Sequence, residues 1–136
     1  MEELEKFFDL NFNDKELLKT ALTHSSYANE NNCESNERLE FIGDAVLDLL
    51  MGKYLYLKYP KNHEGDLTKK RAKNVCESAL VEYAKKCNLS DFLLLGKGEE
   101  KSGGRDRVSL QADAFEALIG AVYLDKGYEE TYKIFD

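Results

Sequence analysis

The residues of this sequence that could do chemistry are carboxylates, grouped on segments with the pattern of apolar helices. The stretch NERLEFIGDAVLDLL, residues 36–50, carries Glu37, Glu40, Asp44 and Asp48. At about 100° per residue, the first three side chains fall within an arc of roughly 60°, with Asp48 at its edge. Like charges at these spacings repel each other, and the arc contains no lysine or arginine to relieve the repulsion. The arc is therefore either an ordinary solvated face or a set of ligands for a hard divalent cation.

A second acidic segment, ADAFEALIGAVYLD at residues 112–125, has no ordinary polar face. Asp113 and Glu116 align with Gly120, whereas the opposite side is apolar. The residues of that apolar stripe are Phe115, Leu118, Ile119 and Val122. Because alanine and glycine flank the two acids and let another backbone come close, we expect both sides of this helix to be buried. Buried carboxylates need either lysine partners, which this face does not contain, or a bound metal ion.

The two segments together predict a metal site between two helices. The four carboxylates expected to surround one cation are Glu40, Asp44, Asp113 and Glu116. Oxygen ligands of this kind favour Mg²⁺ or Mn²⁺ over zinc. A di-iron bundle would require Glu-x-x-His motifs, and neither His24 nor His63 has a glutamate three residues before it. For His24 we expect a structural hydrogen-bonding role and not a nucleophile pair with Ser25 or Ser26, because adjacent side chains seldom point at each other.

Composition indicates one folded domain with an acidic balance. The 136 residues are enough for a domain with a real core, and the 43% hydrophobic content excludes a disordered chain. The net charge of −7, from 26 acidic and 19 basic residues, argues against a general nucleic-acid coat. It leaves room for an enzyme whose carboxylates bind cations. No apolar run approaches the ~20 residues that cross a bilayer, and the acidic N-terminus lacks a signal-peptide pattern, so we expect a cytoplasmic protein.

Two further features are more typical of structure than of chemistry. Cys33, Cys76 and Cys87 are odd in number and widely spaced, which favours reduced thiols over a zinc site or a disulfide framework. The glycine-rich stretch GKGEEKSGGRDR, residues 96–107, lacks the G-x-x-x-x-G-K-[ST] pattern and follows no predicted strand. A nucleotide site in that stretch is therefore not favoured.

Helices are predicted throughout, and they must position the carboxylates. They are expected at residues 15–26, 36–59, 66–88 (in one or two pieces), 109–127 and 128–136. The expected caps are Asn13 or Asp14, Ser35 or Asn36, and Gly127. Pro60 should end the second helix. Residues 28–36 are expected to form a polar loop and residues 96–107 a long flexible one.

Four segments of the sequence resemble the ribonuclease III family, which cleaves double-stranded RNA. NERLEFIGDAVLDLL resembles the signature motif of that family. The other matching segments, in the same order along the chain, are FNDKELLKTALTHSSYANE, HEGDLTKKRAKNV and LGKGEEKSGGRDRVSLQADAFEALIGAVYLD. The resemblance covers nearly the whole chain, and it is to the bacterial type with a single catalytic domain.

The resemblance implies an all-α endonuclease domain that works as a homodimer on double-stranded RNA. It implies that the four carboxylates named above bind a catalytic Mg²⁺, for which Mn²⁺ can substitute, and that Asp44 and Glu116 are catalytic. Glu37 and Glu64 would line the same cleft, and Phe41 would insert into the partner subunit as the dimer anchor. The residues expected to touch RNA phosphates are Lys69, Lys70, Arg71 and Lys73.

Residues 1–136 are expected to form one catalytic domain, and the double-stranded-RNA-binding domain that the family usually carries is not expected in this chain. The implied reaction is attack of metal-activated water on a phosphodiester, which leaves 5′-phosphate and 3′-hydroxyl ends. The implied substrates are structured precursors of ribosomal and messenger RNA. Two alternatives stay open: a catalytically inactive, RNA-binding scaffold of the same type, and a Mg²⁺-dependent phosphohydrolase that acts on small nucleotides.

Overall fold

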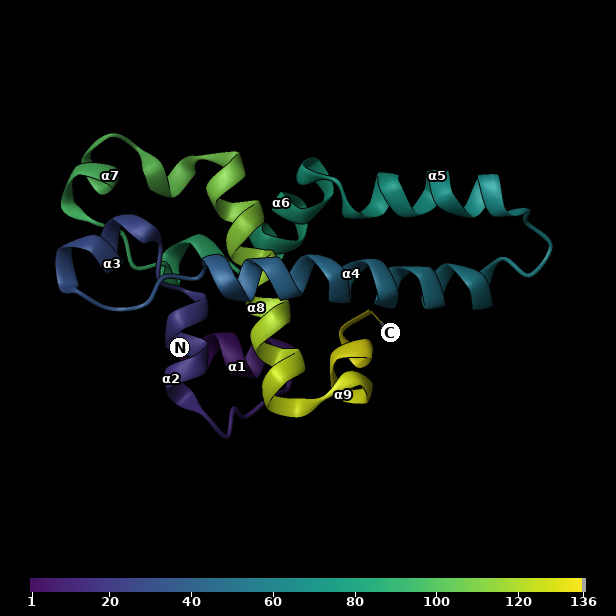
Figure 1. Cartoon of the computed structure of the whole chain (residues 1–136), viewed down its shortest axis with the longest axis horizontal. Helices are drawn as coiled ribbons and strands as arrows, with labels where there is room; N and C mark the ends of the chain where they lie inside the picture. The colour runs from purple at the N-terminus through teal and green to yellow at the C-terminus, as the bar shows by residue number, and fades with distance from the viewer. Residues whose placement is uncertain (136) are drawn as a thin grey trace.

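Helices account for the regular secondary structure of residues 1–135, the part of the chain that this computed structural model describes, with side chains through residue 134 (Figure 1). The predicted all-α class is confirmed. In chain order the elements are α1 (Glu2–Phe8), α2 (Lys15–Ala21), α3 (Ser25–Asn31), α4 (Glu37–Lys58), α5 (Glu64–Val75), α6 (Glu77–Lys86), η1 (Leu89–Phe92), α7 (Lys97–Lys101), η2 (Gly104–Asp106), α8 (Val108–Lys126), α9 (Tyr128–Tyr132) and η3 (Lys133–Phe135).

α4 and α8 cross at the centre of the molecule, where two glycines let their backbones touch (Figure 1). A Cβ atom on Gly43 would lie 2.6 Å from the carbonyl carbon of Glu116 and would overlap its oxygen. A Cβ atom on Gly120 would likewise overlap the carbonyl oxygen of Leu39. Because neither glycine has a side chain to hold the helices apart, the residues on each side of this contact are brought unusually close together.

α8 is buried along most of its length, as its sequence predicts. Its buried residues are Leu110, Gln111, Ala112, Ala114, Phe115, Ala117, Leu118, Ile119, Gly120, Ala121 and Val122. α2, α4 and α6 pack around it. Asp113 and Glu116 are only half-buried, although they lie within this apolar helix. A helix that is hydrophobic nearly all round belongs in the core, so α8 provides a rigid base for these two acids.

α4 continues beyond the body of the molecule and pairs with α5 as a helical hairpin (Figure 1). α4 has 22 residues and ends at Lys58, shortly before Pro60. Proline disfavours helical geometry in the residue before it, which accounts for this end. α5 buries none of its residues fully. The chain turns at Cys76, whose backbone is extended, so the helix expected over residues 66–88 forms two pieces.

The structure shows which of the alternative capping residues is found at each helix end. The Asp14 carboxylate accepts hydrogen bonds from the backbone N–H groups of Glu16 and Leu17 at the start of α2. Asn36 is the N-cap residue of α4, while the Ser35 hydroxyl accepts from the Glu37 N–H at 3.3 Å. Gly127 ends α8 with φ at 88°, a conformation that favours glycine.

Two short helices differ from the sequence prediction. α1 packs against the core through Leu4, which is fully buried. α3 begins within the helix expected over residues 15–26, which itself ends at Ala21, and it includes the first four residues of the polar loop expected at residues 28–36. Both helices have only seven residues, which is too short for a helical period to stand out from the surrounding sequence.

Residues 96–107 do not form the flexible loop that their composition predicts. They include α7 and η2. Arg105 donates to the Glu100 carboxylate at 2.6 Å and to the Ser90 carbonyl oxygen at 2.6 Å. Arg107 donates to the Glu99 carboxylate at 2.6 Å. Charge-assisted hydrogen bonds of this length hold the stretch in one conformation.

The remaining composition-based expectations concern thiols and membranes. Cys33, Cys76 and Cys87 are all free thiols. Burial raises the pKa of the Cys87 thiol to about 11. Among the residues described above, no helix has both the length and the apolar character needed to span a bilayer.

Candidate metal centre

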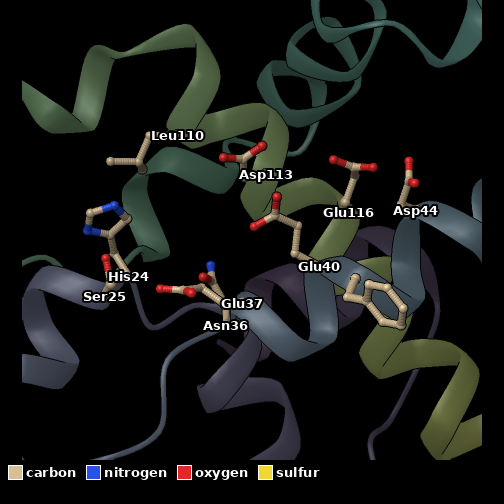
Figure 2. A pocket seen from close by; sticks show the side chains of 10 residues that line it. His24, Ser25, Asn36, Glu37, Glu40, Asp44, Leu110, Asp113 and Glu116 are labelled. Carbon is tan, nitrogen blue, oxygen red and sulfur yellow. The ribbon is translucent and has the colours of Figure 1, made fainter.

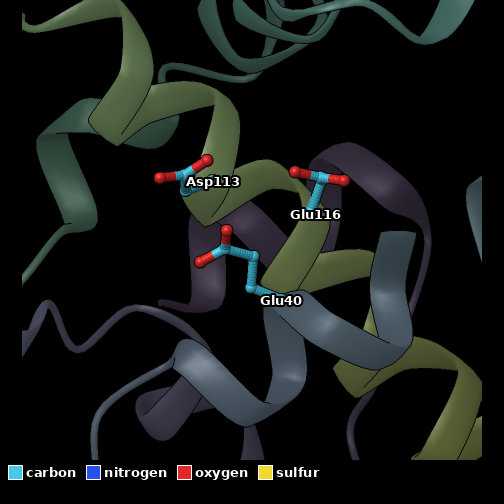
Figure 3. A group of neighbouring side chains, drawn as sticks. All are labelled: Glu40, Asp113 and Glu116. Carbon is cyan, nitrogen blue, oxygen red and sulfur yellow. The ribbon is translucent and has the colours of Figure 1, made fainter. Parts of the chain in front are cut away.

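Three carboxylates from two helices meet where α4 crosses α8. Glu40 lies on α4, and Asp113 and Glu116 lie on α8. One carboxylate oxygen from each residue lies within 4.8 Å of the others, and the three side chains point toward one another (Figure 3). Ligand oxygens of an octahedral Mg²⁺ ion are about 3.0 Å apart when adjacent and about 4.2 Å apart when opposite. Small side-chain rotations are therefore enough to bring these three oxygens onto one divalent cation.

The close crossing of the two helices is what brings these acids together. Gly43 lies one turn after Glu40 on α4 and packs against the backbone of Glu116. Gly120 lies one turn after Glu116 on α8 and packs against the backbone of Leu39. The glycine contact therefore keeps Glu40 beside the α8 acids, and the two helices act as one rigid support.

The pKa values of the three acids are raised, as expected for carboxylates that lie close together where no lysine or arginine of the described residues neutralises them. Burial, and then the Asp44 carboxylate, raise the pKa of Glu116 to about 8. Burial, and then Asp113, raise the pKa of Glu40 to about 7. Burial also raises the pKa of Asp113, although a hydrogen bond with Glu40 acts in the opposite direction. Within the described residues, no lysine or arginine forms a salt bridge with any of these acids.

An open cavity of about 650 Å³ surrounds the three carboxylates (Figure 2). Its lining residues are His24, Ser25, Asn36, Glu37, Glu40, Phe41, Asp44, Leu110, Asp113 and Glu116. Asp44 lies at one end and His24 with Ser25 at the other, with the three-carboxylate group between them (Figure 2). Hard oxygen ligands with no cationic partner, open to solvent on one side, suit a divalent metal ion that also contacts a substrate.

The fourth predicted ligand, Asp44, lies beside this group but not in it. The structure brings together Glu40, Asp113 and Glu116. Asp44 is exposed, and after burial it is the largest cause of the raised pKa of Glu116. Glu37 is also exposed and lines the same cavity. Both acids therefore lie where they can contact what the cavity binds.

Glu64 does not line this cavity within one chain. It begins α5 and lines a separate groove with Gly52 and Arg71. Gly52 follows Glu40 on α4 by 12 positions, or about 18 Å of helix. Because α5 runs antiparallel to α4, its first residue lies at the opposite end of α4 from Glu40 (Figure 1).

The four basic residues of α5 do not share one surface. Lys69 and Lys73 are exposed and one turn apart, so they lie on the same side of α5. The Lys70 ammonium lies 4.7 Å from the centre of the Tyr59 ring. Arg71 lines the groove beside Glu64. Lys69 and Lys73 thus lie side by side toward solvent, whereas Arg71, which is also exposed, lies at the groove.

Phe41 and His24 lie at the cavity in ways that their types alone do not indicate. The Phe41 side chain is 82% exposed, although it is a large aromatic group. His24 is the N-cap of α3, as a structural hydrogen-bonding role predicts, and its Nδ1 accepts from the Ser26 N–H at 3.1 Å. Its ring also lines the cavity, which sequence reasoning missed because α3 is positioned by long-range contacts, with α7 and with the Gly96 N–H.

Comparisons with known proteins agree with one another. A family model described as Ribonuclease-III-like matches residues 14–136. Ribonuclease 3 of Clostridium kluyveri is 53% identical over 131 residues, which cover 96% of this chain and 54% of that protein. Ribonuclease 3 of Listeria welshimeri is 54% identical over 132 residues, which cover 95% of this chain and 58% of that protein. The chain thus spans little more than half the length of these curated relatives.

Solved structures show the same fold. A nuclease domain of ribonuclease III from Campylobacter jejuni superposes with a TM-score of 0.93 at 46% identity, covering 98% of this chain and 92% of that one. In that protein, a region of the nuclease domain is involved in dimer formation. A second structure of the same nuclease domain gives a TM-score of 0.92.

Proposed function

The chain belongs to the ribonuclease III family, and we propose that residues 1–136 form the catalytic domain of an endonuclease that cleaves double-stranded RNA. The observation that carries this proposal is the group of three uncompensated carboxylates in an open cavity. Structured precursors of ribosomal and messenger RNA are the proposed substrates, and the cytoplasm, where such precursors occur, is the proposed place of action.

The proposed cofactor is Mg²⁺, with Mn²⁺ as a substitute. Glu40, Asp113 and Glu116 would hold the ion, because their oxygens are hard ligands and already lie within 4.8 Å of one another. When bound, the ion activates water and neutralises negative charge that develops on the phosphate oxygens. The raised pKa values of Glu40 and Glu116 support this assignment, since a cation would remove the repulsion that contributes to them.

In the proposed reaction, the carboxylates have different roles. Asp44 is exposed beside Glu116, so its carboxylate can orient the attacking water and accept its proton. Attack at phosphorus breaks the bond to the 3′-oxygen, which takes a proton from solvent. The products are a 5′-phosphate and a 3′-hydroxyl end. Glu37, at the rim of the cavity, would orient the substrate through water or a second cation.

Two copies of the chain are proposed to act on the two RNA strands. One side of α4, here called the apolar face of α4, carries Phe41, Ala45, Leu49, Gly52 and Tyr56 within an arc of roughly 80°. The large side chains on it are 82%, 58% and 70% exposed for Phe41, Leu49 and Tyr56. An exposed apolar stripe of this length indicates a protein interface. The exposure of Leu49, a large apolar residue, is explained if it packs against a second copy.

The dimer would pair the two cavities. The apolar face of α4 adjoins the acidic side of the same helix, because Asp44 and Glu37 lie next to Phe41 on the helix surface. A second copy related by two-fold symmetry would therefore place its own three-carboxylate group along one groove shared by the two copies, here called the valley. Each RNA strand would then meet one group. Lys69 and Lys73 would contact phosphates outside the valley, with Lys70 and Arg71 as weaker contacts.

A cleavage gel tests the proposal. End-labelled double-stranded RNA, single-stranded RNA of the same sequence and a nucleoside triphosphate are each incubated with the protein in Mg²⁺, Mn²⁺, Ca²⁺ or EDTA. We expect cuts in the duplex with Mg²⁺ and Mn²⁺ only, because Ca²⁺ has looser coordination geometry and positions water poorly. Duplex binding without cleavage would indicate an inactive scaffold, and turnover of the nucleotide alone would indicate a small-nucleotide phosphohydrolase.

A further inference from the structure

The cavity around the metal centre has two chemically different ends. Five of its ten lining residues are carboxylates: four lie in the middle and toward the Asp44 end, and Glu37 lies on the side of Ser25 and Asn36. Hydrogen-bond donors are found only at the other end, among His24, Ser25 and Asn36 (Figure 2). The Asn36 amide is buried and already donates to the Ala21 carbonyl oxygen at 3.2 Å. Apart from the second N–H of this buried amide, the donors left for whatever enters the cavity are those of His24 and Ser25.

The hydrogen bonds of His24 determine which of its nitrogens can donate. Its Nδ1 accepts from the Ser26 backbone N–H at 3.1 Å and lies 2.8 Å from the Ser26 hydroxyl. That hydroxyl accepts from the Gly96 N–H at 2.8 Å, so its own proton is free to bond to Nδ1. In a neutral imidazole with Nδ1 as acceptor, the proton is on Nε2. His24 thus presents an Nε2–H group as its donor.

Among the described residues, the His24 Nε2–H group has no acceptor at hydrogen-bond distance. The nearest carboxylate oxygen, Glu99 Oε1, lies 3.9 Å from Nε2, which is too long for a hydrogen bond. The other oxygen of Glu99 is held by Arg107 at 2.6 Å, so Glu99 cannot easily move closer. The Ser25 hydroxyl likewise has no hydrogen bond among the residues that the structure describes. Both groups are rigidly placed by the start of α3 and by the pairs that hold residues 96–107.

An RNA strand meets carboxylates alone around the metal centre, but it meets hydrogen-bond donors as well beside His24 and Ser25. Its phosphodiesters are repelled by carboxylates unless a cation lies between them, so only one phosphate can be held at the metal centre. The next phosphate along the strand needs neutral or positive donors, and His24 and Ser25 are the free donors that the cavity offers. We propose that His24 Nε2–H and the Ser25 hydroxyl bind a non-bridging oxygen of the phosphate next to the scissile one. This proposal rests on the proposed cleavage of RNA.

The alternative is that His24 only caps α3. The chain contains a matched comparison, because its other histidine, His63, is the N-cap of α5. His63 is exposed, does not line the cavity and makes no side-chain cap hydrogen bond. Asparagine is a good N-cap residue, so His24→Asn keeps a capping oxygen and loses the reach of Nε2. His63→Asn is the control.

The test measures single-turnover cleavage of a duplex RNA in Mg²⁺ at increasing protein concentration. His24→Asn and Ser25→Ala should each raise the half-saturating concentration about 10-fold, the value of one hydrogen bond to a charged group. His63→Asn should leave it unchanged. Mn²⁺ affinity and the melting temperature should stay at wild-type values in all variants, because none of them changes a proposed metal ligand.

A second substrate series locates the contact. Each phosphate near the cut is replaced in turn by a neutral methylphosphonate. One position next to the scissile phosphate should weaken half-saturation of the wild type about 10-fold and have little added effect in His24→Asn. Should His24→Asn fail to fold, Ser25→Ala alone decides: an unchanged half-saturation overturns the proposal. Equal losses at every position in wild type and variant overturn it too. Absence of duplex cleavage by the wild type would instead overturn the proposed function.

Discussion

Replacement of Gly43 by alanine tests whether the close crossing of α4 and α8 builds the metal centre. The added Cβ atom would lie 2.6 Å from the carbonyl carbon of Glu116, whereas carbon atoms in contact normally stay about 3.5–4.0 Å apart. The two helices must therefore separate by about 1 Å at this point. That movement takes Glu40 away from Asp113 and Glu116, since Glu40 is on the other helix.

The expected change in the free energy of unfolding of Gly43→Ala is the sum of two opposing effects. Overpacking of a core costs about 1–3 kcal/mol, and alanine in place of glycine in a helix returns about 1 kcal/mol. Because the obstacle at Gly43 is backbone and not the end of a flexible side chain, we expect a net loss of about 2 kcal/mol in the free energy of unfolding. A displacement of about 1 Å also exceeds the ~0.5 Å tolerance of a binding site, so Mn²⁺ affinity should fall at least about 10-fold.

Urea unfolding of the metal-free protein and calorimetric titration with Mn²⁺ measure the two effects. Gly65→Ala is the matched control: Gly65 lies in α5, and a Cβ atom there meets no other atom within 4 Å. That control should gain about 0.5–1 kcal/mol and keep its Mn²⁺ affinity. If Gly43→Ala is as stable as Gly65→Ala and binds Mn²⁺ equally well, the glycine contact does not set the geometry of the site.

Three further predictions concern assembly, pH and RNA binding. Phe41→Ala removes a side chain that is 82% exposed and should raise the dimer dissociation constant about 30-fold or more; an unchanged value in analytical sedimentation would contradict the proposed dimer. The metal-free protein should lose stability as pH rises from about 5 to 8, because the folded state holds protons on Glu40 and Glu116 up to pKa values of about 7 and 8, above their ordinary value of 4.5. In thermal unfolding, Glu116→Gln should lose less stability than the wild type over this pH range. An equal loss in the two proteins would argue against a proton held on Glu116. Replacing Lys69 and Lys73 together by alanine should reduce the salt slope of duplex binding by about one for each phosphate that these lysines neutralise, and an identical slope would remove them from the interface.

The positions of the acids could be predicted because helical period and residue type act locally. α8 carries its acids among alanine, glycine and large apolar residues, and this pattern already requires burial on all sides. Asp14 and Gly127 are recognisable as caps because the hydrogen bonds and backbone angles at helix ends favour few residue types. The signature motif adds a family resemblance that the comparisons bear out.

Features that depend on long-range packing could not be predicted in the same way. The antiparallel α4–α5 hairpin moves Glu64 away from Glu40, which no local pattern reveals. The stretch 96–107 reads as flexible from its glycines and charges, but Arg105 reaches back to the Ser90 carbonyl oxygen. Leu49 lies at the edge of the apolar side of α4, and only the packed structure shows that it is exposed.

The claim that Glu40, Asp113 and Glu116 hold the cation for RNA cleavage is tested most directly by one comparison of rates. Duplex RNA is cut in Mg²⁺ under single-turnover conditions by the wild type, by Glu116→Gln and by Glu129→Gln, which changes an exposed glutamate on α9. We expect the wild type and Glu129→Gln to cut at the same rate and Glu116→Gln to be at least about 100-fold slower, since even residues that only support metal ligands cost about 10–100-fold. Cleavage by Glu116→Gln at nearly the wild-type rate would contradict the assignment of the metal centre.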